Sequence, residues 1–144
     1  MPRVDFYLLK SDSPNERLIF SCRLAEKAYD NNSRLYIHMD NQQEAEALNK
    51  TLWTFRQNSF IPHQLYNPAQ KDDFDTPILI GYGAIPAIQS SVVLNLSNGT
   101  PRCFDDFERI LEVIPSDETS KKLARMRYKH YRECNYTLET HNIG

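Results

Sequence analysis

Glycine is scarce in this sequence, with four in 144 residues. None lies in the segment 10–15, Lys-Ser-Asp-Ser-Pro-Asn, which follows the first expected strand, and Gly81-Tyr82-Gly83 is followed by no third glycine. Phosphate-binding loops depend on glycine because their backbone must approach the phosphate closely. The sequence therefore predicts no nucleotide-binding loop and no cofactor.

Cysteine and histidine are few and widely spaced. Cys22, Cys103 and Cys134 are odd in number and form no C-x-x-C pair, so we expect reduced, largely buried thiols and no zinc site. The histidines have no metal-ligand spacing among themselves, and His38 with Asp40 cannot complete a metal shell. No nucleophile elbow or H-E-x-x-H motif is present. We expect no metal and no catalytic site, and keep a small enzyme using His38 and Asp40 as an alternative.

An excess of one charge and long apolar runs are missing as well. The formal net charge of −2 argues against a protein that grips nucleic acid along a long footprint, so an anionic partner must meet a local basic patch. No apolar span of membrane length is present, and the first residues lack the apolar region of a signal peptide. We expect a cytoplasmic protein without membrane contact, folded as a single domain over residues 1–144.

Strands and helices alternate along the chain. We expect strands over residues 4–9, 34–39, 77–82 and 91–96, where short β-branched and aromatic runs occur. Helices are expected from Asn15 to about Asp30, after Pro14, and over residues 43–53, capped by Asp40 and Asn41. The alternation predicts an α/β fold, a mostly parallel central sheet flanked by helices.

A third helix is expected from about Phe104. Phe107, Ile110, Leu111 and Ile114 follow one another at helical spacing, which would bury one side of that helix. The segment 115–118, Pro-Ser-Asp-Glu, then ends it and begins a last helix, with a capping side chain and acids in the first turn.

The last helix, over residues 121–132, carries a basic face with an aromatic ring in its middle. At about 100° per residue, Lys121, Arg125, Tyr128 and Arg132 share one stripe, with Lys122 and Lys129 beside it and Leu123, Ala124 and Tyr131 opposite. Guanidinium groups hold carboxylates bidentately and stack on rings, so the face suits a ligand with carboxylates and an aromatic ring. A solvated surface helix is the alternative.

A second candidate surface is the apolar group Trp53, Phe55, Phe60, Ile61 and Pro62. Tryptophan and phenylalanine dominate interface hot spots because each buries a large apolar area with few rotatable bonds. The group is either a docking surface at a helix end or part of the core.

Several of these segments together resemble a known family, the chi subunit of bacterial DNA polymerase III holoenzyme. They are Leu52-Trp53, residues 59–63 (Ser-Phe-Ile-Pro-His), the 121–132 helix, the opening residues 6–9 (Phe-Tyr-Leu-Leu) and the run from Phe107 to Pro115. They occur in the same order over essentially the whole chain.

The resemblance implies a non-catalytic adaptor, with a fold related to nucleotide-binding domains but without the phosphate loop. Such a subunit binds psi, which ties it to the clamp loader, and binds the acidic C-terminal tail of single-stranded DNA-binding protein, with DNA contact weak or indirect. The residues that match the psi-binding surface are Trp53, Phe60, Ile61 and Pro62. Those that match the tail-binding surface are Ile114, Lys121, Arg125, Tyr128 and Lys129. We expect Lys122 and Arg132, on the same helix, to belong to this surface as well.

Two further hypotheses stay open. Direct single-stranded nucleic-acid binding by the basic helix, with Tyr128 or Tyr131 stacking on a base, is the alternative to the adaptor. The loop Asp72-Asp73-Phe74-Asp75 places acids around a phenylalanine, as the tail does, and could mask the tail site.

Overall fold

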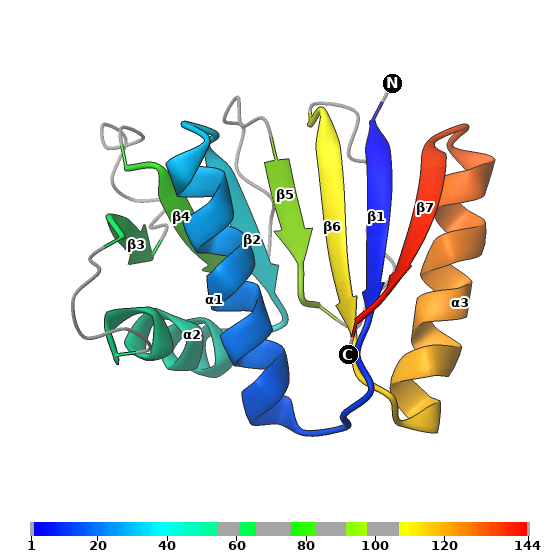
Figure 1. Cartoon of the computed structure of the whole chain (residues 1–144), viewed down its shortest axis with the longest axis horizontal. Coiled ribbons are helices and arrows are strands. Elements are labelled where there is room, and N and C mark those ends of the chain that lie inside the picture. The colour runs from blue at the N-terminus through cyan, green and yellow to red at the C-terminus, as the bar shows by residue number, and fades with distance from the viewer. Residues whose placement is uncertain (1, 55–60, 66–75, 83–91, 98–106, 144) are drawn as a thin grey trace.

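A computed structural model describes residues 2–54, 61–65, 76–82, 92–97 and 107–143. In these ranges one seven-stranded sheet has the order β3-β4-β2-β5-β6-β1-β7, and every strand pair is parallel. The elements are β1 Arg3–Leu8, α1 Pro14–Asp30, β2 Leu35–Met39, α2 Gln42–Thr54, β3 His63–Leu65, β4 Ile78–Tyr82, β5 Val92–Asn95, β6 Arg109–Ile114, α3 Glu118–Glu133 and β7 Thr137–Asn142 (Figure 1). The predicted α/β class and parallel sheet are confirmed.

The helices begin where the sequence predicted, because polar side chains cap them. The Ser13 hydroxyl accepts from the Glu16 N–H at 3.4 Å, and Pro14 stands at the start of α1. The side-chain oxygen Oδ1 of Asn41 accepts from the Glu44 N–H at 2.9 Å at the start of α2. Each cap satisfies a backbone donor that has no partner inside its helix.

Two apolar clusters lie on opposite faces of the sheet. On one face α1 and α2 cover side chains such as Ile37, Ile80 and Leu94, and on the other α3 covers side chains such as Phe6 and Ile110. In Figure 1, α1 crosses the front of the sheet and α3 stands beside β7.

The expected third helix is wrong, because residues 109–114 form β6, which lies inside the sheet between β5 and β1. Ile110, Leu111, Glu112, Val113 and Ile114 are all buried, since both faces of this strand are covered. A strand buried on both faces shows no alternation of apolar and polar residues. Its apolar positions therefore matched the spacing of a helix.

Three other features depart from the predictions. The short strand β3 and the exposed edge strand β7 were not predicted. Cys134 is disulfide-bonded, so the expectation of reduced thiols is wrong for this residue. Cys22 is a free, buried thiol, and its burial raises the pKa of the thiol to about 12. Cys103 lies outside the described residues.

No helix in the described ranges is long and apolar enough to cross a membrane.

The candidate site lies at the carboxyl ends of the neighbouring strands β1 and β6. The chain leaves β1 toward α1 on one face and leaves β6 toward α3 on the other, although the two strands are neighbours. The Leu9 N–H donates to the Ile114 carbonyl at 2.9 Å, and the Ser116 N–H donates to the Ser11 carbonyl at 3.1 Å. Open α/β sheets bind ligands outside the carboxyl ends of the strands, where connections depart to opposite faces.

Candidate functional site

Helix α3 is fixed to the sheet by one stripe of its surface. Asp117 caps it, with a carboxylate oxygen 3.0 Å from the Ser120 N–H, and Ala124, Arg127 and Tyr131 are its buried residues. Leu123, expected to pack inward, is only half-buried. Arg127, not expected at all, takes the central buried position.

The buried Arg127 belongs to a polar network that ties α3 to β6. Its Nε donates to Glu112 Oε1 at 3.0 Å, and Glu112 Oε2 accepts from the Tyr131 hydroxyl at 2.6 Å and from Asn95 Nδ2 at 2.9 Å. Burial raises the pKa of the Glu112 carboxyl, and the Arg127 charge with these hydrogen bonds opposes the rise. A buried charge pair held by further hydrogen bonds favours one relative placement of its elements.

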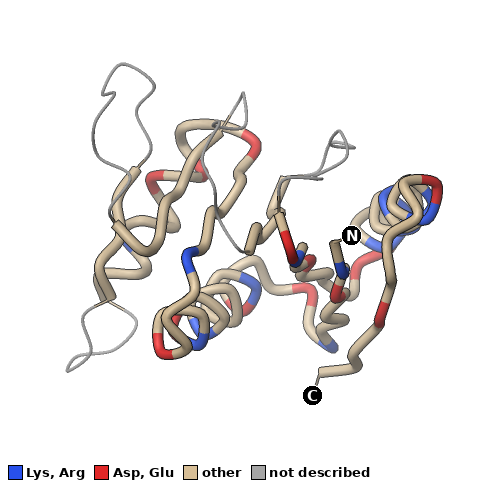
Figure 2. The backbone as a smooth tube through the Cα atoms, turned by 90° about the horizontal axis from the view of Figure 1, so that it is seen from above, with Lys and Arg blue, Asp and Glu red and all other residues tan. Residues whose placement is uncertain are grey.

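The cations of α3 lie on its outward side. Each of them is exposed, and within the described part of the chain none forms an ion pair. They are Lys121, Lys122, Arg125, Lys129 and Arg132. Figure 2 shows the Lys and Arg positions gathered along this helix at one end of the sheet. Unpaired cations on one helix face create a local positive patch despite the net charge of −2.

A cavity of about 400 Å³ lies between the first half of α3 and the carboxyl ends of β1 and β6; we call it the α3 pocket. Its apolar lining consists of Phe6, Leu8, Leu9, Ile114, Pro115 and Ala124. Its polar rim consists of Lys121, Arg125, Tyr128 and Thr140. The Tyr128 ring lies 5.4 Å from the Phe6 ring, centre to centre. The pocket thus combines an apolar interior with cations at the mouth.

Four predicted tail-site residues meet in this pocket: Ile114, Lys121, Arg125 and Tyr128. The other three, Lys122, Lys129 and Arg132, are on α3 but do not line it. Sequence reasoning missed the contributions of β1 and β7, such as Leu8 and Thr140, because the pairing of β1 with both β6 and β7 was not predicted.

The second candidate surface is at the end of α2. Trp53 is 56% exposed, and its ring meets the His63 ring edge-on at 5.0 Å. Ile61 is buried at 1% exposure and Pro62 is half-buried, while Phe60 and the loop 72–75 lie outside the described residues. Trp53 and Pro62 therefore offer surface, whereas Ile61 belongs to the core.

His38 and Asp40, the residues of the alternative enzyme, lie in different surroundings. The His38 ring is buried, with Nδ1 3.0 Å from the Tyr36 hydroxyl, and burial lowers its pKa. Asp40 is exposed. The Tyr36 ring requires glycine at position 81, since a Cβ there would lie 2.7 Å from its hydroxyl oxygen.

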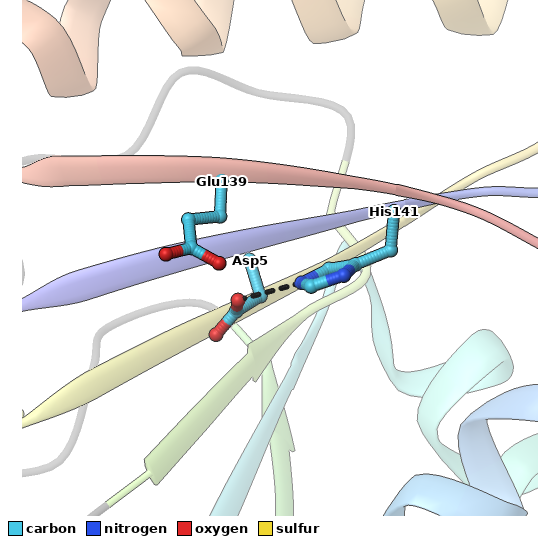
Figure 3. A group of neighbouring side chains, drawn as sticks. All are labelled: Asp5, Glu139 and His141. Carbon is cyan, nitrogen blue, oxygen red and sulfur yellow. Dashed lines mark hydrogen bonds and ion pairs between the residues drawn. The ribbon is translucent and has the colours of Figure 1, made fainter.

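Asp5, Glu139 and His141 form a group in which three possible metal-ligand atoms lie within 4.8 Å of one another (Figure 3). The Arg3 Nη2 already bridges the two acids, at 3.0 Å from Asp5 Oδ1 and 2.9 Å from Glu139 Oε2. Arg109 Nε and His141 Nε2 bond the Asp5 carboxylate at 2.6 and 2.8 Å. The Arg3 and Arg109 guanidinium groups neutralise the acids, so the group is an ion-pair network and fits a metal ion poorly.

Comparison with known proteins gives the family of the chain. Residues 1–139 match the family described as DNA polymerase III chi subunit, HolC. The chain belongs to the chi subunit family of DNA polymerase III. A chi subunit of Pseudomonas aeruginosa is 34% identical over 99% of this chain and 98% of its own length. Those of Haemophilus influenzae and Escherichia coli are 28% and 27% identical, over 96% and 97% of both chains.

Membership of the chi family confirms the predicted resemblance. The chain is a subunit of DNA polymerase III in DNA replication and is not itself an enzyme, in agreement with the sequence-based expectation. Membership of the polymerase assembly also implies protein partners.

Solved structures of another kind share the fold. The C-terminal domain of the DEAD-box protein Dbp5 superposes with a TM-score of 0.60 over 95% of this chain and 90% of that domain, at 11% identity. A Saccharomyces cerevisiae Dbp5 variant bound to nup159, gle1, ip6 and adp gives 0.66 over 98% of this chain and 42% of its own. At such identity the likeness extends to the fold alone.

Proposed function

We propose that this chi subunit is an adaptor which binds the acidic C-terminal tail of single-stranded DNA-binding protein in the α3 pocket. It binds psi through the surface around Trp53 and so links that protein to the clamp loader. The observation that carries the proposal is the α3 pocket itself, where an apolar cavity opens between Lys121 and Arg125, neither of which is engaged by another charge of the described chain.

The chemistry of the pocket matches a peptide that ends in an aromatic residue. Ile114 and Leu8 supply contact for a ring, and Arg125 can hold a carboxylate bidentately, the arrangement used for capture of a C-terminus. Exposed ion pairs contribute on the order of 0–1 kcal/mol each. Affinity should therefore depend on the ring and on Arg125, with a micromolar, salt-sensitive contact as the result.

Three further cations extend the positive surface beyond the pocket. Lys122, Lys129 and Arg132 are exposed on the same helix and suit the acidic residues that precede the terminal ring. Because these three residues do not line the pocket, we expect replacing any one of them to lower the affinity for the tail less than replacing Arg125 does. They act chiefly on the association rate, because like charges on one face steer an anionic peptide toward the pocket.

The second surface has the character of a protein contact. A tryptophan that is 56% exposed at a helix end, beside the half-buried Pro62, offers an apolar area suited to a partner's side chains. Phe60, which lies outside the described residues, is kept as a proposed psi contact, whereas the buried Ile61 offers no surface for direct contact. The two surfaces lie on α2 and α3, at opposite sides of the sheet in Figure 1, so we expect psi and the tail to bind together. We further propose a cytoplasmic location, without membrane contact, cofactor or metal.

Replacing Arg125 by alanine tests the adaptor against direct nucleic-acid binding. We expect the affinity for the tail peptide to fall roughly tenfold or more, as for a hot-spot arginine, while affinity for single-stranded DNA changes little. Lys50→Ala, an exposed cation on α2, is the control for loss of one charge. A variant that loses only DNA affinity would identify the helix as a nucleic-acid surface.

A further inference from the structure

A second cavity lies next to the α3 pocket, on the other side of the carboxyl end of β1. It has a volume of about 510 Å³ and shares Leu9 with the α3 pocket. Its walls are the link after β1 and one stripe of α1, and Ile143 after β7 closes it. We call it the α1 groove.

The lining of the α1 groove repeats the chemistry of the α3 pocket. Its apolar side chains, Leu9, Ile19, Phe20 and Ile143, are only half-buried. Lys10 and Arg23 lie at its rim, both exposed and without an ion pair in the described part of the chain. The groove also contains one acid, Glu16, so its cations outnumber its acids.

The position of the groove is fixed by the sheet. The Ile143 N–H donates to the Leu8 carbonyl at 2.9 Å, which holds the residue after β7 against the end of β1. The Phe20 ring packs on the Tyr7 ring at 5.5 Å, centre to centre, and anchors the α1 wall. Both cavities therefore lie at the carboxyl ends of β1 and β7.

We propose that the α1 groove is a second subsite for the same acidic peptide and takes an apolar side chain upstream of the terminal residue. The inference rests on the proposed function of the α3 pocket. With the terminal ring in the α3 pocket, the upstream chain crosses Leu9 and enters the groove, where Lys10 and Arg23 meet its acidic residues. An extended peptide advances about 3.3–3.6 Å per residue, so a few residues cover the width of a strand end.

The alternative path runs along α3 past Lys129 and Arg132. These two cations line neither the α3 pocket nor the α1 groove, and the apolar side chain near them, Met126, is exposed on the helix surface. Of the two paths, the groove is the one that combines an apolar cavity with cations. An upstream apolar side chain therefore gains more from burial in the groove than on α3.

The test uses two peptides and two matched protein variants. The short peptide is Asp-Asp-Asp-Phe, and the long one is Asp-Leu-Asp-Asp-Leu-Asp-Asp-Asp-Phe. Lys10→Glu with Arg23→Glu alters the groove, whereas Lys27→Glu with Lys50→Glu makes the same charge change at exposed positions that line neither cavity. Dissociation constants are measured by calorimetry at fixed ionic strength.

We expect the wild-type chain to bind the long peptide roughly tenfold more tightly than the short one, a difference of about 1.4 kcal/mol. The groove variant should lose this gain and bind both peptides alike, and the control variant should keep it. A long peptide whose leucines are replaced by serine should bind nearly as weakly as the short one.

Other results overturn the inference while leaving the proposed function intact. The inference is overturned when the long peptide binds no better than the short one. It is also overturned when the gain in affinity survives in the groove variant and disappears in Lys129→Glu with Arg132→Glu. A serine-substituted peptide that keeps the full gain also overturns it. Failure of the short peptide to bind the wild-type chain, or binding that is unchanged in Arg125→Ala, instead contradicts the proposed function.

Discussion

Replacing Trp53 by alanine should separate partner binding from folding. The side chain is 56% exposed, and a tryptophan presents up to about 250 Å² of surface. About 140 Å² is then available to a partner, equivalent to at most ~3.5 kcal/mol at about 25 cal/mol per Å². Costs of binding reduce this figure. We expect psi binding to weaken by about 2–3 kcal/mol, roughly 30- to 150-fold.

The stability of the variant should change much less than its affinity. Alanine is the best helix former, and the remaining loss is the partly buried area of Trp53 with its edge contact to His63. The matched control is Leu52→Ala, one residue earlier in α2 and 2% exposed. It should lower the free energy of unfolding by about 2–5 kcal/mol and leave psi affinity unchanged below its melting temperature.

Two measurements are made on each variant. Calorimetric titration gives its affinity for psi, and circular dichroism follows its thermal unfolding. Trp53→Ala should lose affinity and keep its melting temperature within a few degrees. If it melts as early as Leu52→Ala, Trp53 is a core residue. If affinity for psi is unchanged while the fold is intact, the proposed docking surface is wrong.

Two further predictions concern stability. Glu112→Gln leaves Arg127 as a buried charge without a partner carboxylate, so it should destabilise the fold by about 3–5 kcal/mol, and Glu112→Gln with Arg127→Met should recover part of the loss in urea unfolding. Burial favours a higher pKa for the Asp5 carboxyl, but hydrogen bonds from His141, Arg109 and Arg3 hold it below the usual value of 3.8. The ionised Asp5 carboxylate therefore stabilises the folded protein above pH 3.8, and this stabilisation is lost as the pH falls through the lower pKa of the folded state. The melting temperatures of wild type and Asp5→Asn should therefore differ at neutral pH and converge in acid; a constant difference would contradict the account.

Local sequence signals were enough for much of the fold. Side-chain caps such as Ser13 and Asn41, and the short apolar runs that became β2 and β4, depend on neighbouring residues only. Alternation of these elements then requires a parallel sheet. The α/β class could be predicted because each step rests on local chemistry.

The interior strand β6 was missed because its environment is made by distant segments. In the expected helix Glu112 would lie opposite the apolar side, whereas in β6 it is buried and bonded to Arg127 and Tyr131, residues that come later in the chain. A single sequence does not indicate that a glutamate and an arginine will pair in the interior. The same pairing explains why Arg127 was not expected among the buried residues of α3.

The residues that α3 contributes to the candidate site could be predicted from the sequence, but those that the strands contribute could not. The stripe of Lys121, Arg125 and Tyr128 follows from helical periodicity, and all three residues line the pocket. Leu8 and Thr140 come from β1 and β7, whose pairing depends on strand order. The polar edge strand β7 has little of the alternation that marks a strand, so nothing local indicated this wall of the pocket.

The central claim is that this chi subunit holds the tail of single-stranded DNA-binding protein in the α3 pocket. The most direct test is co-purification of the chain, together with psi, with full-length and with tail-truncated single-stranded DNA-binding protein. We predict a ternary complex with the full-length protein, lost on removal of the tail and weakened in Arg125→Ala. Equal recovery of full-length and truncated protein would contradict the account.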